Sequence, residues 1–536
     1  MKKLILILTL FTAYVSFSQE DAWVYFNDKP NAASFFSNPL SELSQKALDR
    51  RTAQGITLVI NDAPLEVTYV NQITSATGIT VMAKSKWLNC LHIRGSVTDI
   101  QALAALPFVN HVHFADNSLN NKMATPATIS PVNKTMETQI NFNYGTSANQ
   151  IQMLNGHLLH QTDYTGTGKI IAVLDSGFIG VDTAQPFQRL FTNNLILGGY
   201  NYVSQSTNLY VLHNHGTMTL SCMGGFTDNQ LVGTAPDANY YLFITEDVAS
   251  ENPVEESYWV QAAEEADRLG ADIITSSLGY FGYDNPNYSY TYSQMTGNTA
   301  FASQGANIAF SKGIVVVASA GNSGNSADPH IGVPAEANNV LAIGAVKADR
   351  SYASFSSIGP SFDLRVKPDV MAQGQSSVLS NTAGSIVTAS GTSFSCPIMA
   401  GMIACFWQAI PWANNAQIVQ FVKQSADRFS TPDNLYGYGI PDFQLALNIA
   451  NLATIENNKE VFVLYPNPTS NNVTISVPVD VNEAKVLFYN TLGQVVLEKM
   501  ISKSVSTLSL ETLNSGVYYY KVQTDTVSQT GKIIKE

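Results

Sequence analysis

Residues 170–177 are Ile-Ile-Ala-Val-Leu-Asp-Ser-Gly, five apolar residues followed by an acid, a serine and a glycine. An unbroken apolar run of this length predicts a strand buried on both faces, as in a parallel sheet. Asp175 ends the run, so we expect its carboxylate at the carboxyl end of a strand, where open α/β sheets place their chemistry. Taken alone, an aspartate after a strand is more often a turn residue or a helix cap.

The surrounding sequence repeats this pattern. Short apolar runs alternate with helical stretches between residues 150 and 452. The runs lie at 240–244, 272–276, 314–319 and 340–346, and the helical stretches include 255–269 and 299–312. This alternation predicts an α/β domain, a mostly parallel sheet with helices on both faces and right-handed crossovers.

A second motif, His-Asn-His-Gly-Thr-Met, occupies residues 213–218. His215 stands before a short apolar stretch at 218–223 that predicts a helix. A helix beginning there would hold the imidazole rigidly, as a general base requires. A single histidine is usually structural, and His213 is a second histidine close by.

Two further motifs follow. Residues 390–397 are Ser-Gly-Thr-Ser-Phe-Ser-Cys-Pro, a glycine turn that leads into an apolar helix at 398–409 and exposes the Ser393 hydroxyl at the helix start. Helix N-termini favour negative charge, although a serine there is commonly a plain N-cap. Residues 319–324 are Ser-Ala-Gly-Asn-Ser-Gly, where Asn322 is able to donate to an oxyanion or to act as a turn residue.

The conjunction of these motifs carries the argument. Each one closes a strand or opens a helix at the same predicted edge, and the order is Asp, His, Asn, Ser. That order differs from the Ser-acid-His order of α/β-hydrolases, and the Gly-x-Ser-x-Gly elbow of lipases and esterases is missing from the sequence.

Residues 150–452 resemble the subtilisin-like serine peptidases. The matching strings are VLDSG (173–177), HGT (215–217), SSLG (276–279), SAGN (319–322) and SGTSFSCP (390–397). The resemblance implies that Asp175 orients His215, that His215 is the general base and that Ser393 is the nucleophile. It further implies an oxyanion hole made by Asn322 and the Ser393 backbone N–H.

The same resemblance implies a substrate-binding segment. Ser277, Leu278 and Gly279 would pair with the substrate backbone, and Ala320 and Gly321 would stand opposite them across the primary pocket. The sequence departs from the family where a second histidine is common, at Met218, and in Phe394–Ile398. The Tyr- and Asn-rich stretch 280–294 is equally consistent with a rim loop that contacts substrate and with a loop packed on its own aromatic residues.

The amino-terminal part predicts export and a zymogen. Residues 1–18 combine two lysines, an apolar run and small residues at a cleavage site, as a signal peptide does. Residues 19–115 show a small α+β pattern, with strand-like runs at 66–70, 79–83, 90–94 and 109–114 and a helical stretch at 100–106. By resemblance this is the family's inhibitory propeptide, and residues 116–149 form a linker that holds the processing site.

The carboxyl-terminal part, residues 458–536, predicts a small β-sandwich from alternating strands at 473–477, 485–489 and 517–522. It resembles the sorting domain of the type IX secretion system of Bacteroidetes in YPNP (465–468), NTLGQVV (490–496), LNSGVYYYKV (513–522) and GKIIKE (531–536). From its composition alone this domain would equally bind carbohydrate or a surface.

Composition excludes several function classes. The formal charge of −13 and the lack of a long basic run argue against nucleic-acid binding. The four cysteines have no zinc-site spacing, and we expect buried, inert thiols at Cys90, Cys222, Cys396 and Cys405. We expect no cofactor and no metal ligands; calcium stabilises many members of the resembled family, but no dense carboxylate loop identifies ligands for it.

The predicted function is a secreted or surface-exposed serine endopeptidase, exported through the periplasm, monomeric and made as a zymogen. Its expected partners are protein or peptide substrates, its own propeptide and the secretion machinery. An extended groove and an apolar pocket favour unfolded proteins cut beside bulky apolar residues. The alternatives are a catalytically silent surface binding protein on the same fold and a secreted esterase that uses the same triad.

Overall fold

The computed structural model describes residues 19–120, 142–457, 462–477, 482–502, 506–524 and 528–536. Met1–Asn451 form one compact unit and Leu452–Glu536 form another. The predicted signal peptide and most of the predicted linker lie outside the described residues. No helix in the described part of the chain is long and apolar enough to cross a membrane.

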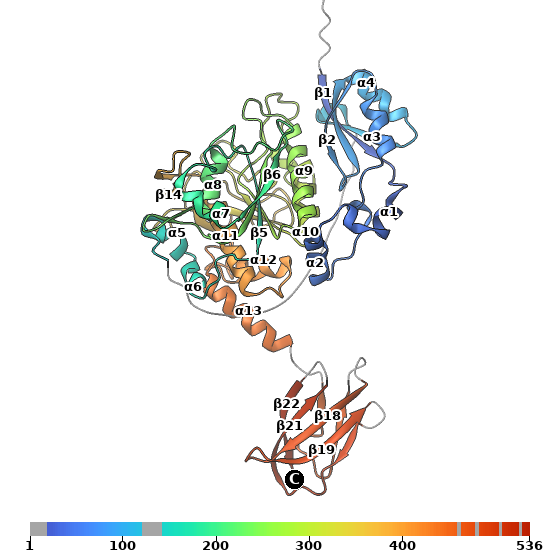
Figure 1. Ribbon diagram of the computed structural model, residues 1–536, viewed down its shortest axis with the longest axis vertical. Helices are drawn as coiled ribbons and strands as arrows, with labels where there is room; N and C mark the ends of the chain where they lie inside the picture. Colours follow the sequence, from blue (N-terminus) through green and yellow to red (C-terminus); the bar gives the residue numbers. More distant parts are fainter. Residues whose placement is uncertain (1–18, 121–141, 458–461, 478–481, 503–505, 525–527) are drawn as a thin grey trace, which may run out of the picture. The chain divides into compact units, whose positions relative to one another are not determined.

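The N-terminal region is a four-stranded antiparallel sheet, in the order β2-β3-β1-β4, with helices on one side (Figure 1). Its strands are β1 (Gln19–Phe26), β2 (Ile79–Ser85), β3 (Cys90–Ser96) and β4 (Val109–Phe114), and its helices are α1 (Ala32–Ser37), α2 (Gln45–Ala53), α3 (Val67–Thr74) and α4 (Val97–Ala102). The strand predicted at 66–70 is wrong. Glu66 caps α3 by accepting a bond from the Thr68 backbone N–H (3.2 Å), so a helix begins there despite the β-branched residues.

The central region contains a seven-stranded sheet whose strand pairs are all parallel, in the order β13-β12-β11-β10-β5-β9-β6. The strands are β5 (Ile170–Asp175), β6 (Ile196–Asn201), β9 (Asn239–Ile244), β10 (Ile273–Ser276), β11 (Val315–Ser319), β12 (Val340–Val346) and β13 (Val370–Gln373). Every residue of β5 is buried, as its apolar sequence predicts. The predicted α/β class with a parallel sheet is confirmed.

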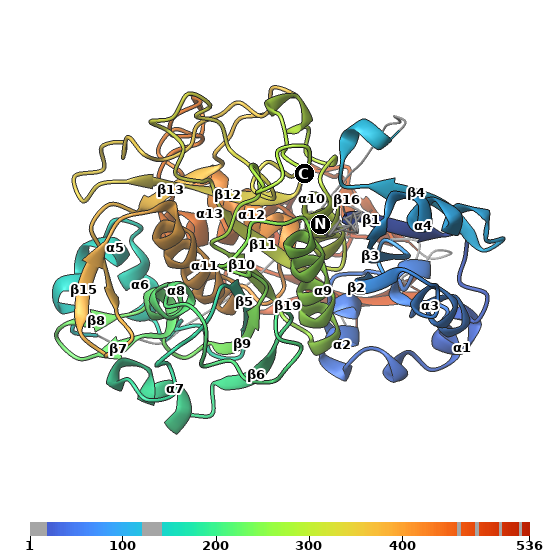
Figure 2. The ribbon, with the colours of Figure 1, turned by 90° about the horizontal axis from the view of Figure 1, so that it is seen from above.

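Helices cover both faces of this sheet. The larger helices are α8 (His215–Gly224), α9 (Val254–Leu269), α10 (Phe301–Ser311), α11 (Thr392–Ala409), α12 (Asn415–Gln424) and α13 (Phe443–Asn457). Helices α8 and α11 pack together across one face, and α9 and α10 pack together on the other, as Figure 2 shows from above. Shorter helices α5 (Ala148–Gln152), α6 (Gly156–His160) and α7 (Gln188–Thr192) and the strand pairs β7 (Phe226–Thr227) with β8 (Leu231–Val232) and β14 (Ser377–Ser380) with β15 (Ile386–Ala389) complete the region.

The N-terminal region packs against α9 and shares a hydrophobic core with the central region. Trp23 stacks on Phe301, with ring centroids 5.0 Å apart, and its indole N–H donates to the Ser257 hydroxyl (2.9 Å). The Nδ1 atom of His92 lies 2.8 Å from the same hydroxyl. One serine of α9 therefore binds two strands of the N-terminal sheet.

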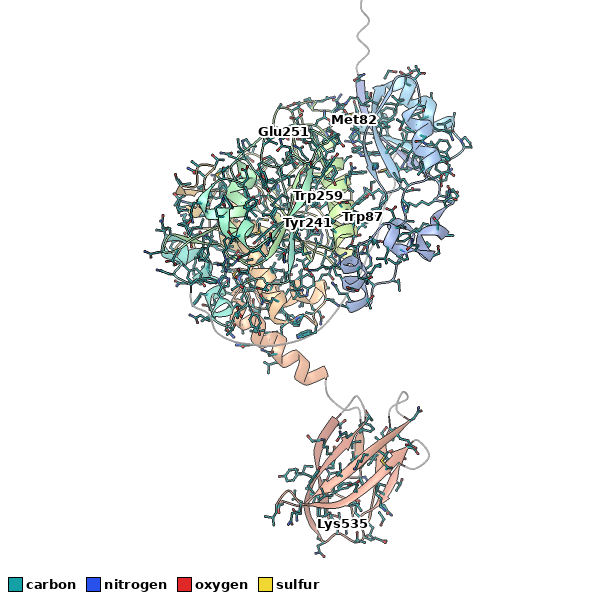
Figure 3. All side chains as sticks on the ribbon, in the orientation of Figure 1. Met82, Trp87, Tyr241, Glu251, Trp259 and Lys535 are labelled. Atoms are coloured by element: carbon teal, nitrogen blue, oxygen red, sulfur yellow. The ribbon has the colours of Figure 1, made fainter. Side chains whose placement is uncertain are left out.

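Glu264, also on α9, forms a second contact. Its buried carboxylate accepts bonds from the Ser85 hydroxyl (2.6 Å) and from the backbone N–H groups of Lys86 (3.1 Å) and Trp87 (3.0 Å). Trp87 is labelled in Figure 3 on the side of the N-terminal region next to α9. The carboxylate thus accepts hydrogen bonds from the donors of a turn of the N-terminal region, which would otherwise be buried and unpaired.

The Tyr-rich stretch 280–294 packs on the body of the molecule. The hydroxyls of Tyr283 and Tyr290 both donate to the buried Glu256 carboxylate at 2.7 Å. The Tyr288 hydroxyl donates to Glu20 of the N-terminal region (2.8 Å). The loop thus combines internal aromatic packing with a contact to the N-terminal region.

The C-terminal unit consists of two antiparallel sheets, β16-β17-β20 and β19-β18-β21-β22. The strands are β16 (Val463–Tyr465), β17 (Asn472–Ser476), β18 (Glu483–Tyr489), β19 (Val495–Ser502), β20 (Thr507–Ser509), β21 (Gly516–Gln523) and β22 (Ser528–Lys535). Side chains from both sheets, including Ile475 and Phe488, form one core, so the predicted β-sandwich is present.

Candidate active site

The carboxylate of Asp175 lies buried at the end of β5 with both oxygens occupied. Oδ1 accepts from the Ser176 backbone N–H (2.8 Å) and lies 2.7 Å from Nδ1 of His215. Oδ2 accepts from the Thr219 hydroxyl (3.0 Å). The carboxylate is therefore held in one orientation, with His215 as its charge partner.

His215 is the first residue of α8, as its motif predicts. Thr219 lies one turn further along the same helix, so both side chains face Asp175. The next residue is a glycine because a Cβ on Gly216 would lie 2.4 Å from the Gly177 carbonyl oxygen. This close approach of two backbones brings the helix start against the end of β5.

The environment of His215 favours the charged imidazolium. Burial lowers the pKa of His215, but the charge of Asp175, its hydrogen bond and the charge of Glu246 together outweigh burial. The pKa of His215 therefore lies above its usual value. An imidazole whose proton affinity rises beside a carboxylate is suited to accept a proton from a neighbouring hydroxyl.

Ser393 is the second residue of α11, and its position follows from a proline further along the helix. Pro397 has no N–H, so the Ser393 carbonyl lacks its helical partner four residues on. The Ser277 hydroxyl donates to that carbonyl instead (2.9 Å). A serine and a proline together thus link the start of α11 to the segment after β10.

The Ser393 hydroxyl donates a long hydrogen bond of 3.5 Å to the Ser277 carbonyl. Although the structure describes both Ser393 and His215, their side chains form no hydrogen bond with each other in it. The ring of the next residue, Phe394, lies 6.2 Å from the imidazole, which places the two helix starts side by side. In structures without substrate the bond between nucleophile and base is often long or absent and tightens on binding.

Asn322 follows β11 and is oriented by Thr392. Its side-chain oxygen accepts from the Thr392 backbone N–H (2.9 Å) and hydroxyl (3.1 Å), which leaves the amide N–H₂ group free to donate elsewhere. Gly321 has a φ of +100°, a conformation that favours glycine, and its N–H donates to the Thr392 hydroxyl (3.2 Å). The turn and the start of α11 therefore hold Asn322 beside Ser393.

The predicted substrate-binding residues leave the same edge of the sheet. Ser277, Leu278 and Gly279 follow β10, and Ala320 and Gly321 follow β11. Strands β10 and β11 are parallel neighbours, and Ser276 near the end of β10 pairs with Ala318 near the end of β11. The two segments therefore leave the sheet side by side. The structure brings all nine predicted site residues to this edge.

Two residues near this edge were missed in the sequence. Thr219 was detectable as the residue one helical turn after His215. Glu246 follows β9, the neighbour of β5, and accepts a 2.6 Å bond from the Tyr280 hydroxyl. Burial raises the pKa of Glu246 well above its usual value, partly offset by that hydrogen bond. Its place two residues past a strand end was the available signal.

Cys90, Cys222, Cys396 and Cys405 are free and buried, as predicted, and burial raises the pKa of Cys396 to about 12. In the described parts of the chain, no group of three or more His, Cys, Asp or Glu side chains is arranged to hold a metal ion. Among these described residues, therefore, no calcium ligand is assigned.

A parallel sheet with an Asp–His pair, an oriented asparagine and an exposed serine at its carboxyl edge is the arrangement of a serine hydrolase. Residues 166–439 match the model of the subtilase family, and the chain belongs to that family of serine peptidases. Residues 21–130 match the peptidase S8 propeptide domain of Bacteroidota, and residues 463–536 match a secretion system C-terminal sorting domain.

Curated relatives include subtilisin from Bacillus pumilus, 30% identical over 55% of this chain and 97% of the relative. Subtilisin NAT from Bacillus subtilis subsp. natto is 30% identical over 55% of this chain and 70% of its own length. A solved structure of MycP1 without its propeptide is 23% identical, with a TM-score of 0.45, and covers 56% of this chain and 96% of that one.

These matches establish the organisation of the protein. It is made as a zymogen with an S8 propeptide and exported by type IX secretion to the cell surface or the extracellular space.

Proposed function

We propose that this protein is a serine endopeptidase that cleaves protein or peptide substrates through an acyl-enzyme on Ser393. The observation that carries the proposal is the 2.7 Å contact between Asp175 and His215 at the sheet edge where α11 begins with Ser393. In this reading Asp175 holds His215 in one tautomer and stabilises the imidazolium.

The first half-reaction forms the ester. The Ser393 Oγ attacks the substrate carbonyl carbon while Nε2 of His215 takes its proton. The oxyanion accepts bonds from the Asn322 amide and the Ser393 backbone N–H, both fixed before substrate binds. Collapse breaks the C–N bond as His215 returns the proton to the leaving amine.

The second half-reaction hydrolyses the ester. Water loses a proton to His215 and attacks the acyl carbon. The ester bond between that carbon and the Ser393 oxygen then breaks as His215 returns the proton to this oxygen, which releases the acid product. The segment Ser277–Gly279 would align the substrate as an added strand, with Ala320 and Gly321 on the other side of the primary pocket. This alignment is what favours peptides over simple esters as substrates.

The test compares two histidines that lie two residues apart at the start of α8. His215→Ala should reduce casein cleavage by at least about 10³-fold, because it removes the base. His213→Ala is the matched control, since this exposed histidine lies two residues before His215 and the proposed mechanism gives it no step. Unchanged casein cleavage by folded His215→Ala protein would contradict the role of His215 as the base. Folded, processed wild-type protein that cleaves no casein would instead favour a silent binding protein.

A further inference from the structure

A further contact between the propeptide and the peptidase lies remote from the active site. It consists of Arg50, Arg51 and Asp62 from the propeptide and Asp267 and Lys312 from the central region, a cluster we call the α2 anchor. All five side chains are at most 4% exposed. Charged side chains are rarely buried so completely unless they are paired.

The charges of the α2 anchor alternate across the interface. Lys312 lies 3.1 Å from Asp62, and Arg51 donates to Asp62 and to Asp267, at 2.8 Å each. Arg50 donates to the other oxygen of Asp267. Asp267 thus accepts from both arginines, and neither side of the interface satisfies its charges alone.

The guanidinium of Arg50 also recognises the backbone. Its Nη1 donates to the Ala271 carbonyl (2.5 Å) and its Nε to the Lys312 carbonyl (3.2 Å). A planar fork with donors in fixed directions suits three separate acceptors, whereas a lysine ammonium does not. The site on the central region is therefore shaped for a pair of arginines at the end of a helix.

The anchor lies at the opposite edge of the sheet from the catalytic residues. Ala271 and Lys312 precede β10 and β11, whereas Ser277 and Asn322 follow these strands. Helix α9 connects the two edges and, with 16 residues, is about 24 Å long. In Figure 1, α2 lies beside one end of α9 and the strands of the propeptide lie beside the other end.

We propose that the α2 anchor sets the rate at which the propeptide leaves the peptidase once the linker between them has been cut. Cleavage in the linker leaves the contacts of the α2 anchor in place, because its three propeptide residues all lie upstream of the cut. Asp62, the nearest of them, is still far from residue 121. Release then requires both arginines to leave Asp267, or a further cut within the segment that carries them. The partner that fits Asp267 is a helix end with two adjacent arginines.

The test uses the full chain with Ser393→Ala, so that it does not depend on the chemistry proposed above. A recognition sequence for a highly specific protease is inserted within residues 121–141 and cut with that protease. Propeptide retention on the cut complex is followed over time by size-exclusion chromatography. The variants are Arg51→Ala and Asp267→Asn, and Lys84→Ala, an exposed lysine on β2, is the control.

The wild-type and Lys84→Ala complexes should keep the propeptide through chromatography. Arg51→Ala should release it at least about 30-fold faster, the lower range for truncating one partner of a buried interfacial charge pair. The double variant Arg51→Ala/Asp267→Asn should release the propeptide at a rate below the product of the two single-variant effects, because both changes break the same pair, Arg51 with Asp267.

Two results would overturn the proposal. One is a wild-type propeptide that separates as soon as the linker is cut, and the other is single variants that retain it as long as the wild type does. If Arg51→Ala does not fold, Arg50→Lys replaces it, since this change keeps the charge and loses the fork that serves three acceptors.

Discussion

Replacing Thr219 by valine removes the hydroxyl that donates to Oδ2 of Asp175 and nearly preserves the shape of the residue. A hydrogen bond to a charged group contributes about 1.5–3 kcal/mol. Asp175 keeps its contacts with His215 and Ser176, so we expect about 1–2 kcal/mol of this to appear in the barrier, a decrease of about 5- to 30-fold in kcat. KM should not change, because Thr219 is buried and does not reach the substrate.

The pH profile provides the second readout. Without the Thr219 hydroxyl, more of the Asp175 charge acts on His215, so the already raised pKa of His215 rises further. The neutral imidazole is the active form, and the acid limb of kcat/KM should therefore move to higher pH. Hydrolysis of a chromogenic peptide between pH 5 and 10 measures both effects, and Thr219→Ser should restore them. A valine variant within twofold of the wild type at every pH would refute this role.

Three further changes test other parts of the account. Asp175→Asn should lower the pKa of His215, because burial then dominates, and move the acid limb to lower pH; turnover should fall by roughly 10⁴-fold, as in a triad on an unrelated fold. Gly216→Ala should destabilise the folded protein by about 1–3 kcal/mol or more, because the new Cβ meets the Gly177 carbonyl oxygen at 2.4 Å, and its melting temperature should fall. An unchanged melting curve would contradict this. Glu264→Ala should reduce the yield of processed enzyme on gels, since it leaves two buried backbone donors of the propeptide unpaired at about 1–3 kcal/mol each, and an unaltered yield would count against that contact.

The sequence was sufficient for the parts of the fold that depend on local pattern. The apolar runs predicted β5, β9, β10, β11 and β12, because strands buried on both faces are continuous and hydrophobic. Strand β6 was missed since its Gly198 and Gly199 interrupt the apolar pattern. Strand β13 was missed since only one of its four residues, Val370, is β-branched, whereas the equally short β10 has three such residues. The order of the motifs predicted which residues would meet at one edge, and the structure brings them there.

The remaining features depend on contacts distant in sequence. Arg50 and Arg51 have the composition of an exposed helix end, and their burial depends on contacts such as those with Asp267, more than 200 residues away. The helix α3 replaced a predicted strand because a Glu66 cap and packing outweighed the preference of β-branched residues for strands. Neither a cap nor a distant charge partner changes the periodicity of hydrophobic residues, which was the signal used.

The most direct test of the central claim is the site of covalent labelling by phenylmethylsulfonyl fluoride. Because His215 activates the Ser393 hydroxyl in the proposed triad, processed protein should take up one sulfonyl group per chain, on the peptide that contains Ser393, and lose casein cleavage in proportion. His215→Ala should leave that serine unlabelled. Labelling of a different residue, or full casein cleavage by protein labelled at Ser393, would contradict the account.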